Sequence, residues 1–162
     1  MAEHDTRVGW GFDAHRFRAG GAVVLLGVEV DQTRGINATS DGDVAAHAVI
    51  DAVLGALAAG DVGDLFPSHD PEMDGANSME LLGRVVGQAG DAGYRVENVD
   101  VTVVSESVRI APHREAMRGS LAKVLEIDVS AVSVKATTTD GMGSIGADEG
   151  IAAAAVVLIS SP

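Results

Sequence analysis

Apolar and polar residues recur along the chain with two different periods, which predict short strands and three helices. Strands are expected at residues 8–12, 22–30, 96–104, 132–136 and 151–159, where β-branched and other apolar residues alternate or run together. Apolar stripes predict helices from a cap at Ser40 or Asp41 to about residue 59, at 78–92 and at 112–125. Because strands and helices do not alternate strictly, the pattern favours an α+β fold, a mixed β-sheet with helices packed on one face.

Polar and glycine-rich segments separate the predicted elements. We expect a turn at residues 13–18, a loop at 61–77 and a glycine-rich loop at 137–150. No linker, repeat or low-complexity tract divides the chain, and 162 residues are too few for two well-packed cores. Residues 1–162 are therefore expected to form a single domain.

The charge balance limits the partners that the chain can bind. It has 24 Asp and Glu against 11 Lys and Arg, a formal net charge of −13. Nucleic acids and anionic membranes are bound by clustered Lys and Arg, so neither is an expected partner. An anionic small molecule would need metal ions or backbone N–H groups to supply positive charge. The chain has no cysteine, which excludes disulfides and cysteine-ligated zinc.

Neither end of the sequence indicates a membrane or secreted protein. The first residues, MAEHDTRVGW, contain acids and lack the apolar core of a signal peptide. The longest apolar run, residues 151–159, is too short to cross a bilayer. We therefore expect a cytoplasmic location.

Three residues form a candidate metal site. Asp13 and His15 are two positions apart, so an extended chain would point both side chains to one face. His47 lies on the first predicted helix, between Asp43 and Asp51, either of which could orient its imidazole. One carboxylate and two imidazoles suit a zinc ion with an open fourth position. The alternative is that Asp13 and His15 are turn residues and that His47 is an ordinary helix residue.

Two further segments could contact a ligand. In K-A-T-T-T-D (residues 135–140), hydroxyls and backbone N–H groups could hold phosphate oxygens, and Asp140 could hold a cation such as Mg²⁺. The segment D-V-G-D-L-F-P-S-H-D-P (61–71) could close over a ligand. The alternatives are an ordinary strand edge and a surface loop. His4, His69 and His113 have no distinctive spacing and are expected at the surface.

Taken together, these segments resemble the 2-C-methyl-D-erythritol 2,4-cyclodiphosphate synthases of the non-mevalonate isoprenoid pathway. The combination of D-x-H with S-D-G-D-x-x-x-H is specific, and the similarity extends over nearly the whole chain. The stretches that carry it are G-W-G-F-D-A-H (9–15), S-D-G-D-V-A-A-H-A (40–48), D-A-V-L-G (51–55), G-D-V-G-D-L-F-P (60–67), N-V-D-V-T (98–102), V-K-A-T-T-T (134–139) and E-G-I-A (149–152).

The resemblance implies an enzyme of the phosphorus–oxygen lyase class. The substrate would be 4-diphosphocytidyl-2-C-methyl-D-erythritol 2-phosphate, whose 2-phosphate attacks the β-phosphate and releases CMP. The family forms homotrimers with active sites between neighbouring subunits. Asp13, His15 and His47 would bind one Zn²⁺ per subunit, and Mg²⁺ or Mn²⁺ would bridge the diphosphate.

The resemblance also assigns roles to residues. The implied catalytic residues are Thr39, Thr138 and Asp140. The implied substrate-binding residues lie in four segments, of which the one with Asp61 and Gly63 holds the erythritol and the loop 105–111 reads the cytosine. They are Ser40, Asp61, Gly63, Phe66, Ser68, Asp70, Ser105, Arg109, Ile110, Ala111 and Thr137.

The sequence departs from the family pattern at several of these positions. Thr39 replaces a histidine, Ser68 an aspartate and Asp140 a glutamate. Ser144 replaces a phenylalanine and Ala147 an arginine, and Trp10 replaces another histidine. Since the lost arginine and histidine hold a diphosphate in the family's central cavity, we expect no diphosphate to bind there.

Three functions remain open at this point. The first is the synthase itself. The second is a divergent member that acts on a different cytidylylated substrate. The third is a trimeric metal- and nucleotide-binding protein without turnover, which the retained Asp13, His15, His47 and Thr138 disfavour.

Overall fold

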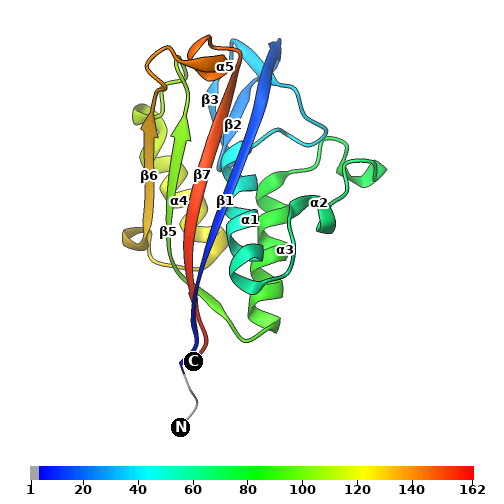
Figure 1. Ribbon diagram of the computed structural model, residues 1–162, viewed down its shortest axis with the longest axis vertical. Coiled ribbons are helices and arrows are strands. Elements are labelled where there is room, and N and C mark those ends of the chain that lie inside the picture. The colour runs from blue at the N-terminus through cyan, green and yellow to red at the C-terminus, as the bar shows by residue number, and fades with distance from the viewer. Residues whose placement is uncertain (1–3) are drawn as a thin grey trace.

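The computed structural model describes residues 4–162 and contains a five-stranded mixed sheet with its helices on one face (Figure 1). The strand order is β4-β1-β7-β5-β6, and only the β5–β6 pair is parallel within this sheet. A separate hairpin pairs β2 with β3. The strands are β1 (Thr6–Ala19), β2 (Val23–Leu25), β3 (Val28–Asp31), β4 (Arg34–Ile36), β5 (Arg95–Val104), β6 (Val132–Thr137) and β7 (Gly150–Ser160).

Three long helices pack behind the sheet: α1 (Val44–Leu57), α3 (Ser78–Asp91) and α4 (Arg114–Leu125). Asp43 caps α1 by accepting from the Ala46 N–H, and Asn77 caps α3. Short helical segments join them: α2 (Val62–Leu65), η1 (Pro71–Met73), η2 (Ala111–His113), η3 (Val129–Ala131) and α5 (Gly143–Gly146). The expected mixed sheet with helices on one face is confirmed.

Two glycines let α1 lie unusually close to β1. A Cβ at Gly11 would stand 2.0 Å from the Ala48 carbonyl oxygen, and one at Gly9 would stand 1.7 Å from the Ala52 carbonyl oxygen. Any side chain there would push the helix away from the strand. The glycines therefore bring His47, on α1, against the residues that follow Gly11 on β1.

The two faces of the sheet differ in their surroundings. The helix-facing residues of β5 and β7, such as Val101 and Val157, are fully buried in one apolar cluster. Figure 1 shows no helix over the opposite face of the sheet. Exposed apolar residues alternate there with the buried positions of β1 and β7: Val8, Trp10, Phe12 and Val156. The Trp10 and Phe12 rings stack there with centroids 6.1 Å apart. This outer apolar face, defined by Val8, Trp10, Phe12 and Val156, is typical of a surface that meets another protein.

Four local expectations are wrong. Residues 13–18 belong to β1, because β1 pairs with β7 as far as Arg16 and then with β4. Residues 22–30 form two strands, because Leu26 and Gly27 adopt positive φ angles of 49° and 74° and reverse the chain. Asp43, not Ser40 or Asp41, caps the first helix. The expected loops at 61–77 and 137–150 contain short helical segments.

Within residues 4–162, no helix combines the length and apolarity that crossing a bilayer requires.

Candidate metal centre and substrate pocket

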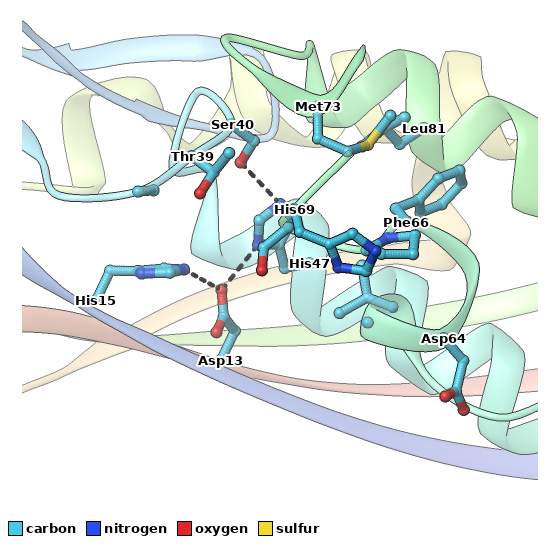
Figure 2. A pocket seen from close by; sticks show the side chains of 15 residues that line it. Asp13, His15, Thr39, Ser40, His47, Asp64, Phe66, His69, Met73 and Leu81 are labelled. Carbon is cyan, nitrogen blue, oxygen red and sulfur yellow. Dashed lines mark hydrogen bonds and ion pairs between the residues drawn. The ribbon is translucent and has the colours of Figure 1, made fainter. Parts of the chain in front are cut away.

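Asp13, His15 and His47 meet on the helix-facing side of the sheet (Figure 2). Asp13 and His15 point to the same side of β1 because they are two residues apart in a strand. One carboxylate oxygen, Asp13 Oδ2, lies 2.9 Å from His47 Nδ1 and 3.1 Å from His15 Nε2. One ligand atom from each residue lies within 4.8 Å of the others. The structure therefore assembles the three predicted ligands from two elements.

The contacts within the cluster shift the pKa values of Asp13 and His47. Burial opposes ionisation of Asp13, but hydrogen bonds from His15 and His47 outweigh it and hold the Asp13 pKa well below its usual range. Burial lowers the pKa of His47, yet the hydrogen bond and charge of Asp13 raise it above its usual value, with smaller contributions from Asp43 and Asp41. The cluster thus favours a positive charge beside the ionised Asp13 carboxylate, carried either by a protonated imidazole or by a metal ion.

The donor set fits zinc. It offers one carboxylate oxygen and two imidazole nitrogens, all ligands of Zn²⁺ in proteins, and a site with three protein ligands keeps a fourth position open. The side chain of His47 is 12% exposed and that of His15 is 27% exposed. His47 is therefore held mostly within the protein, whereas His15 leaves the cluster accessible to solvent.

A pocket of about 560 Å³ opens beside the cluster. Asp13, His15 and His47 form one wall. The other walls include five residues that the sequence assigned to catalysis or substrate binding: Thr39, Ser40, Gly63, Phe66 and Ser68. Asp61 and Asp70 are not among the lining residues; they cap α2 and η1 by accepting from the N–H groups of Asp64 and Glu72, each at 3.0 Å. They support the shape of this loop.

Sequence reasoning missed three residues here. His69 is exposed, as expected, but it also lines the pocket, which was not expected. Ser78 Oγ lies 2.9 Å from His47 Nε2, and Asp41 accepts from Ser78. His69 follows Phe66 on the same loop, a signal that was available, whereas the Ser78 contact joins residues 31 apart in the chain.

The proposed orienting role of Asp43 or Asp51 toward the His47 imidazole is wrong. Neither carboxylate is hydrogen-bonded to that ring. Asp43 is fully buried, and its oxygens accept from Ala46 N and Gly27 N, both at 2.9 Å. Its burial raises its pKa to about 6. Asp51 accepts from Val62 N at 2.7 Å. Both carboxylates therefore accept hydrogen bonds from backbone N–H groups, including those at the starts of α1 and α2.

The remaining predicted residues gather at a different place, around the end of β6. Ser105 N donates to the Thr137 carbonyl oxygen at 3.1 Å, which joins the 105–111 loop to the start of the T-T-T-D segment. Thr137, Thr138 and Asp140 are exposed. The 105–111 loop also contains Arg109, Ile110 and Ala111, of which Ile110 is buried.

An ion-pair network steadies this second group. Asp148 accepts from the Arg34 guanidinium at 2.8 Å and from Ser107 Oγ at 2.7 Å. Arg34 also lies over the Phe17 ring, 3.9 Å from its centroid. Through these contacts the 105–111 loop and the segment before β7 are tied to β4.

The two groups do not meet within one chain. Asp13, Ala153, Val103 and Ala136 pair in one row across β1, β7, β5 and β6. Three strand spacings separate the ends of that row, about 14 Å. Asp13 begins the row, and the T-T-T-D segment follows its far end. The two groups therefore lie at opposite ends of one row of residues that crosses the sheet from β1 to β6.

Comparison with known proteins gives consistent matches. Residues 6–160 match the model of the YgbB family. A 2-C-methyl-D-erythritol 2,4-cyclodiphosphate synthase of Thioalkalivibrio sulfidiphilus is 52% identical over 155 residues, which cover 96% of this chain and 97% of the relative. One of Symbiobacterium thermophilum is 50% identical over 153 residues, 94% of this chain and 98% of the relative.

Solved structures match over nearly the whole chain at lower sequence identity. The bifunctional IspDF of Campylobacter jejuni has a TM-score of 0.95 at 38% identity, over 99% of this chain and 43% of that one. IspF of Plasmodium falciparum in a CDP complex has a TM-score of 0.85 at 30% identity and covers 96% of each chain.

Proposed function

This chain belongs to the YgbB family, and we propose that its pocket carries out the reaction after which its relatives are named. It converts 4-diphosphocytidyl-2-C-methyl-D-erythritol 2-phosphate to 2-C-methyl-D-erythritol 2,4-cyclodiphosphate and releases CMP, as a phosphorus–oxygen lyase of isoprenoid biosynthesis. An oxygen of the 2-phosphate forms a bond to the β-phosphorus. The bond from that phosphorus to the oxygen shared with the α-phosphate breaks, and the shared oxygen leaves on CMP. A cytoplasmic location stays a prediction of the sequence.

The chemistry needs positive charge and exact placement of two phosphates. Asp13, His15 and His47 would hold zinc, and Asp140 would hold Mg²⁺ or Mn²⁺ together with the diphosphate. These ions would supply the positive charge that an acidic chain lacks and would polarise the reacting phosphates. The three clustered ligand atoms support the first ion. The exposed Asp140 carboxylate, a hard oxygen ligand, supports the second.

The polar residues of the two groups place the substrate. Thr138 holds the reacting phosphate through its hydroxyl, and Thr137 contributes beside it. Thr39 and Ser40 contact the phosphate at the metal wall of the pocket, since both line it. The walls formed by Gly63, Phe66 and Ser68 receive the erythritol. Asp61 and Asp70 shape these walls by capping α2 and η1.

The nucleotide lies on the loop that follows β5. Backbone groups of residues 105–111 read the cytosine, with contributions from Ser105, Arg109, Ile110 and Ala111. A relative with 30% identity binds CDP in its solved structure, which supports a cytidine diphosphate ligand for this fold.

The assembly is a homotrimer in which each active site lies between two subunits. Two observations support it. The metal cluster and the T-T-T-D segment lie at opposite ends of one row across the sheet, which supports a site completed by a second copy. The outer apolar face of the sheet, with Trp10 64% exposed, offers a surface for that copy.

The convergence of Asp13, His15 and His47 at the wall of a substrate-sized pocket carries this proposal. The direct test is CMP release from the cytidylylated substrate with Zn²⁺ and Mg²⁺, with the phosphorus product identified by NMR. The expected product is the cyclodiphosphate. A zinc-loaded protein that binds CMP but releases none from this substrate would contradict the proposal.

A second candidate is a divergent enzyme that acts on another cytidylylated substrate. It is favoured by the position of Thr39 and Ser68, since both departures from the family line the pocket itself. Thr39→His and Ser68→Asp, made together, separate the two functions. They change cyclodiphosphate formation little if the chain is the synthase and raise it clearly if it is not.

A further inference from the structure

The imidazole of His47 has a second, buried contact on the side away from Asp13. Its Nε2 lies 2.9 Å from Ser78 Oγ, and Ser78 is fully buried at the start of α3. The Ser78 hydroxyl also contacts Asp41 Oδ1, and the Ser78 N–H donates to Asp41 Oδ2 at 3.0 Å. Asp41, Ser78 and His47 thus form a chain of hydrogen bonds, and its last member, His47, belongs to the metal cluster.

The direction of each hydrogen bond in this chain follows from the donors available. Asp41 Oδ2 faces the Ser78 N–H, and Oδ1 faces the Asp43 N–H at 3.2 Å, so both carboxylate oxygens act as acceptors. The single hydroxyl hydrogen of Ser78 must then point to Asp41. Toward His47, Ser78 Oγ can only accept. The hydrogen of that contact therefore belongs to His47 Nε2.

We propose that Ser78, oriented by Asp41, is a positioning residue that keeps hydrogen on His47 Nε2 and so presents the Nδ1 lone pair to the metal. The inference rests on the proposed function, because it assumes a metal at Asp13, His15 and His47. A neutral imidazole carries one ring hydrogen, and fixing it on Nε2 leaves Nδ1, the nitrogen beside Asp13, as the ligand. Ligand histidines in metalloproteins are commonly oriented in this way by an acceptor on the other nitrogen.

Ser40 is the other hydroxyl near Nε2, but it is the weaker partner. Its Oγ lies 3.3 Å from Nε2, lines the open pocket and is only half-buried. No described carboxylate is hydrogen-bonded to Ser40 Oγ, so the direction of its hydroxyl is not fixed. The buried Ser78 therefore defines the tautomer, and Ser40 adds a longer contact from the solvent side.

The test compares Ser78→Ala with Ser160→Ala. Ser160 is also buried and its Oγ also donates to a carboxylate, that of Glu97, but it lies at the end of β7. Zinc affinity is measured for each folded protein by competition with a chromophoric chelator. We expect Ser78→Ala to bind zinc about ten- to a hundredfold more weakly, the usual cost of losing such a partner. We expect Ser160→Ala to bind it as the unchanged protein does.

Nitrogen NMR of the zinc-loaded protein, with labelled histidine, reads the tautomer directly. We expect hydrogen on Nε2 and metal on Nδ1 of His47. Asp41→Asn provides a second variant: an amide in place of the carboxylate frees the Ser78 hydroxyl to donate to Nε2, so zinc affinity falls without loss of Ser78.

Two results would overturn the inference: metal on Nε2 of His47, or zinc affinity of Ser78→Ala within twofold of the unchanged protein. Absence of zinc binding by the unchanged chain would overturn both the inference and the metal centre. Zinc affinity that depends on Ser78, in a protein that releases no CMP, would refute only the proposed reaction.

Discussion

The two halves of the candidate site are built in different ways. The metal half, Asp13, His15 and His47, is joined by hydrogen bonds of 2.9 and 3.1 Å between side chains of β1 and α1. The phosphate half, the proposed phosphate-binding segment Thr137 to Asp140, is mostly exposed. Its hydrogen bonds include those from Ser105 N to the Thr137 carbonyl oxygen and from Asp140 N to Thr138 Oγ1, both at 3.1 Å. The first is a cluster of hydrogen-bonded side chains, whereas the side chains of Thr137, Thr138 and Asp140 in the second are exposed.

This difference indicates what fixes the geometry of each half. Folding of a single chain fixes the metal half, because Gly11 lets α1 close onto β1. The phosphate half follows the far end of the row of strands that begins at Asp13, and we propose that a neighbouring copy brings its own phosphate half to the metal half. Variants of the metal half should therefore act on each subunit alone, and variants of the phosphate half should act through the assembly.

The largest expected effect is that of His15→Ala. It removes one of three ligands and leaves the fold intact, since the His15 side chain is 27% exposed. We expect zinc to be lost and CMP release to fall by about a thousandfold, because a bound metal supplies several kcal/mol of charge stabilisation. Zinc content by metal analysis and a turnover assay check this.

His69→Ala is the matched control for zinc binding. His69 lines the same pocket but does not belong to the three-ligand cluster. We expect it to retain one zinc per chain. Full zinc content in His15→Ala would show that the metal half has been assigned wrongly.

The second prediction tests whether the two halves come from different subunits. A mixture of His15→Ala with Thr138→Ala, refolded together, places intact metal halves beside intact phosphate halves in about a quarter of the intersubunit sites of random trimers. Each variant alone should be inactive, and the mixture should recover up to that fraction of activity. Activity after co-refolding is compared with that of the separately refolded proteins; no recovery would mean that both halves of a site belong to one chain.

Much of the fold could be predicted from the sequence because its signals are local. The apolar stripe of α1 and the β-branched run of β5 are decided by nearby residues. The extension of β1 through Asp13 and His15 was missed because pairing with β7, more than 130 residues later, outweighs the polar composition of that segment. The break at Leu26 was missed because a leucine at positive φ is unusual.

The candidate site divides in the same way. The metal ligands could be predicted, since D-x-H places two side chains on one face and the family pattern adds His47. Ser78 could not be, because an isolated serine at a helix start carries no signal until α3 packs against α1. The distance between the halves also could not be predicted, since it depends on the strand order of the sheet.

The third prediction concerns the outer apolar face. Val156→Asp places a charge beside Trp10 on β1 and Asp100 on β5, its partners across the sheet. We expect the trimer to dissociate and activity to fall with it, while zinc binding by each subunit persists. Val129→Asp is the control, because Val129 is equally exposed at 42% but lies in η3, away from this face. Analytical ultracentrifugation measures the assembly, and an intact trimer of Val156→Asp would place the interface elsewhere.

The smallest effect is the dependence of zinc affinity on pH. The pKa of His47 is raised above its usual value, so its ligating nitrogen holds a proton over a wider range than an ordinary histidine does. Zinc must displace that proton, and the apparent affinity is therefore level at high pH and falls as the pH drops through the raised pKa. Asp13, with its pKa held low, stays ionised throughout and does not contribute to the fall.

As the pH is lowered, we expect zinc affinity to begin to fall while the pH is still above about 6.5, the ordinary pKa of histidine. Below that onset the affinity should fall at least tenfold for each pH unit. Chelator competition between pH 8 and pH 5.5 measures the affinity, and circular dichroism at each pH shows that the chain stays folded. An affinity that does not change over this range would remove His47 from the ligand set. A decline that begins only well below pH 6.5 would mean that Asp13 does not hold the His47 proton as the 2.9 Å contact indicates.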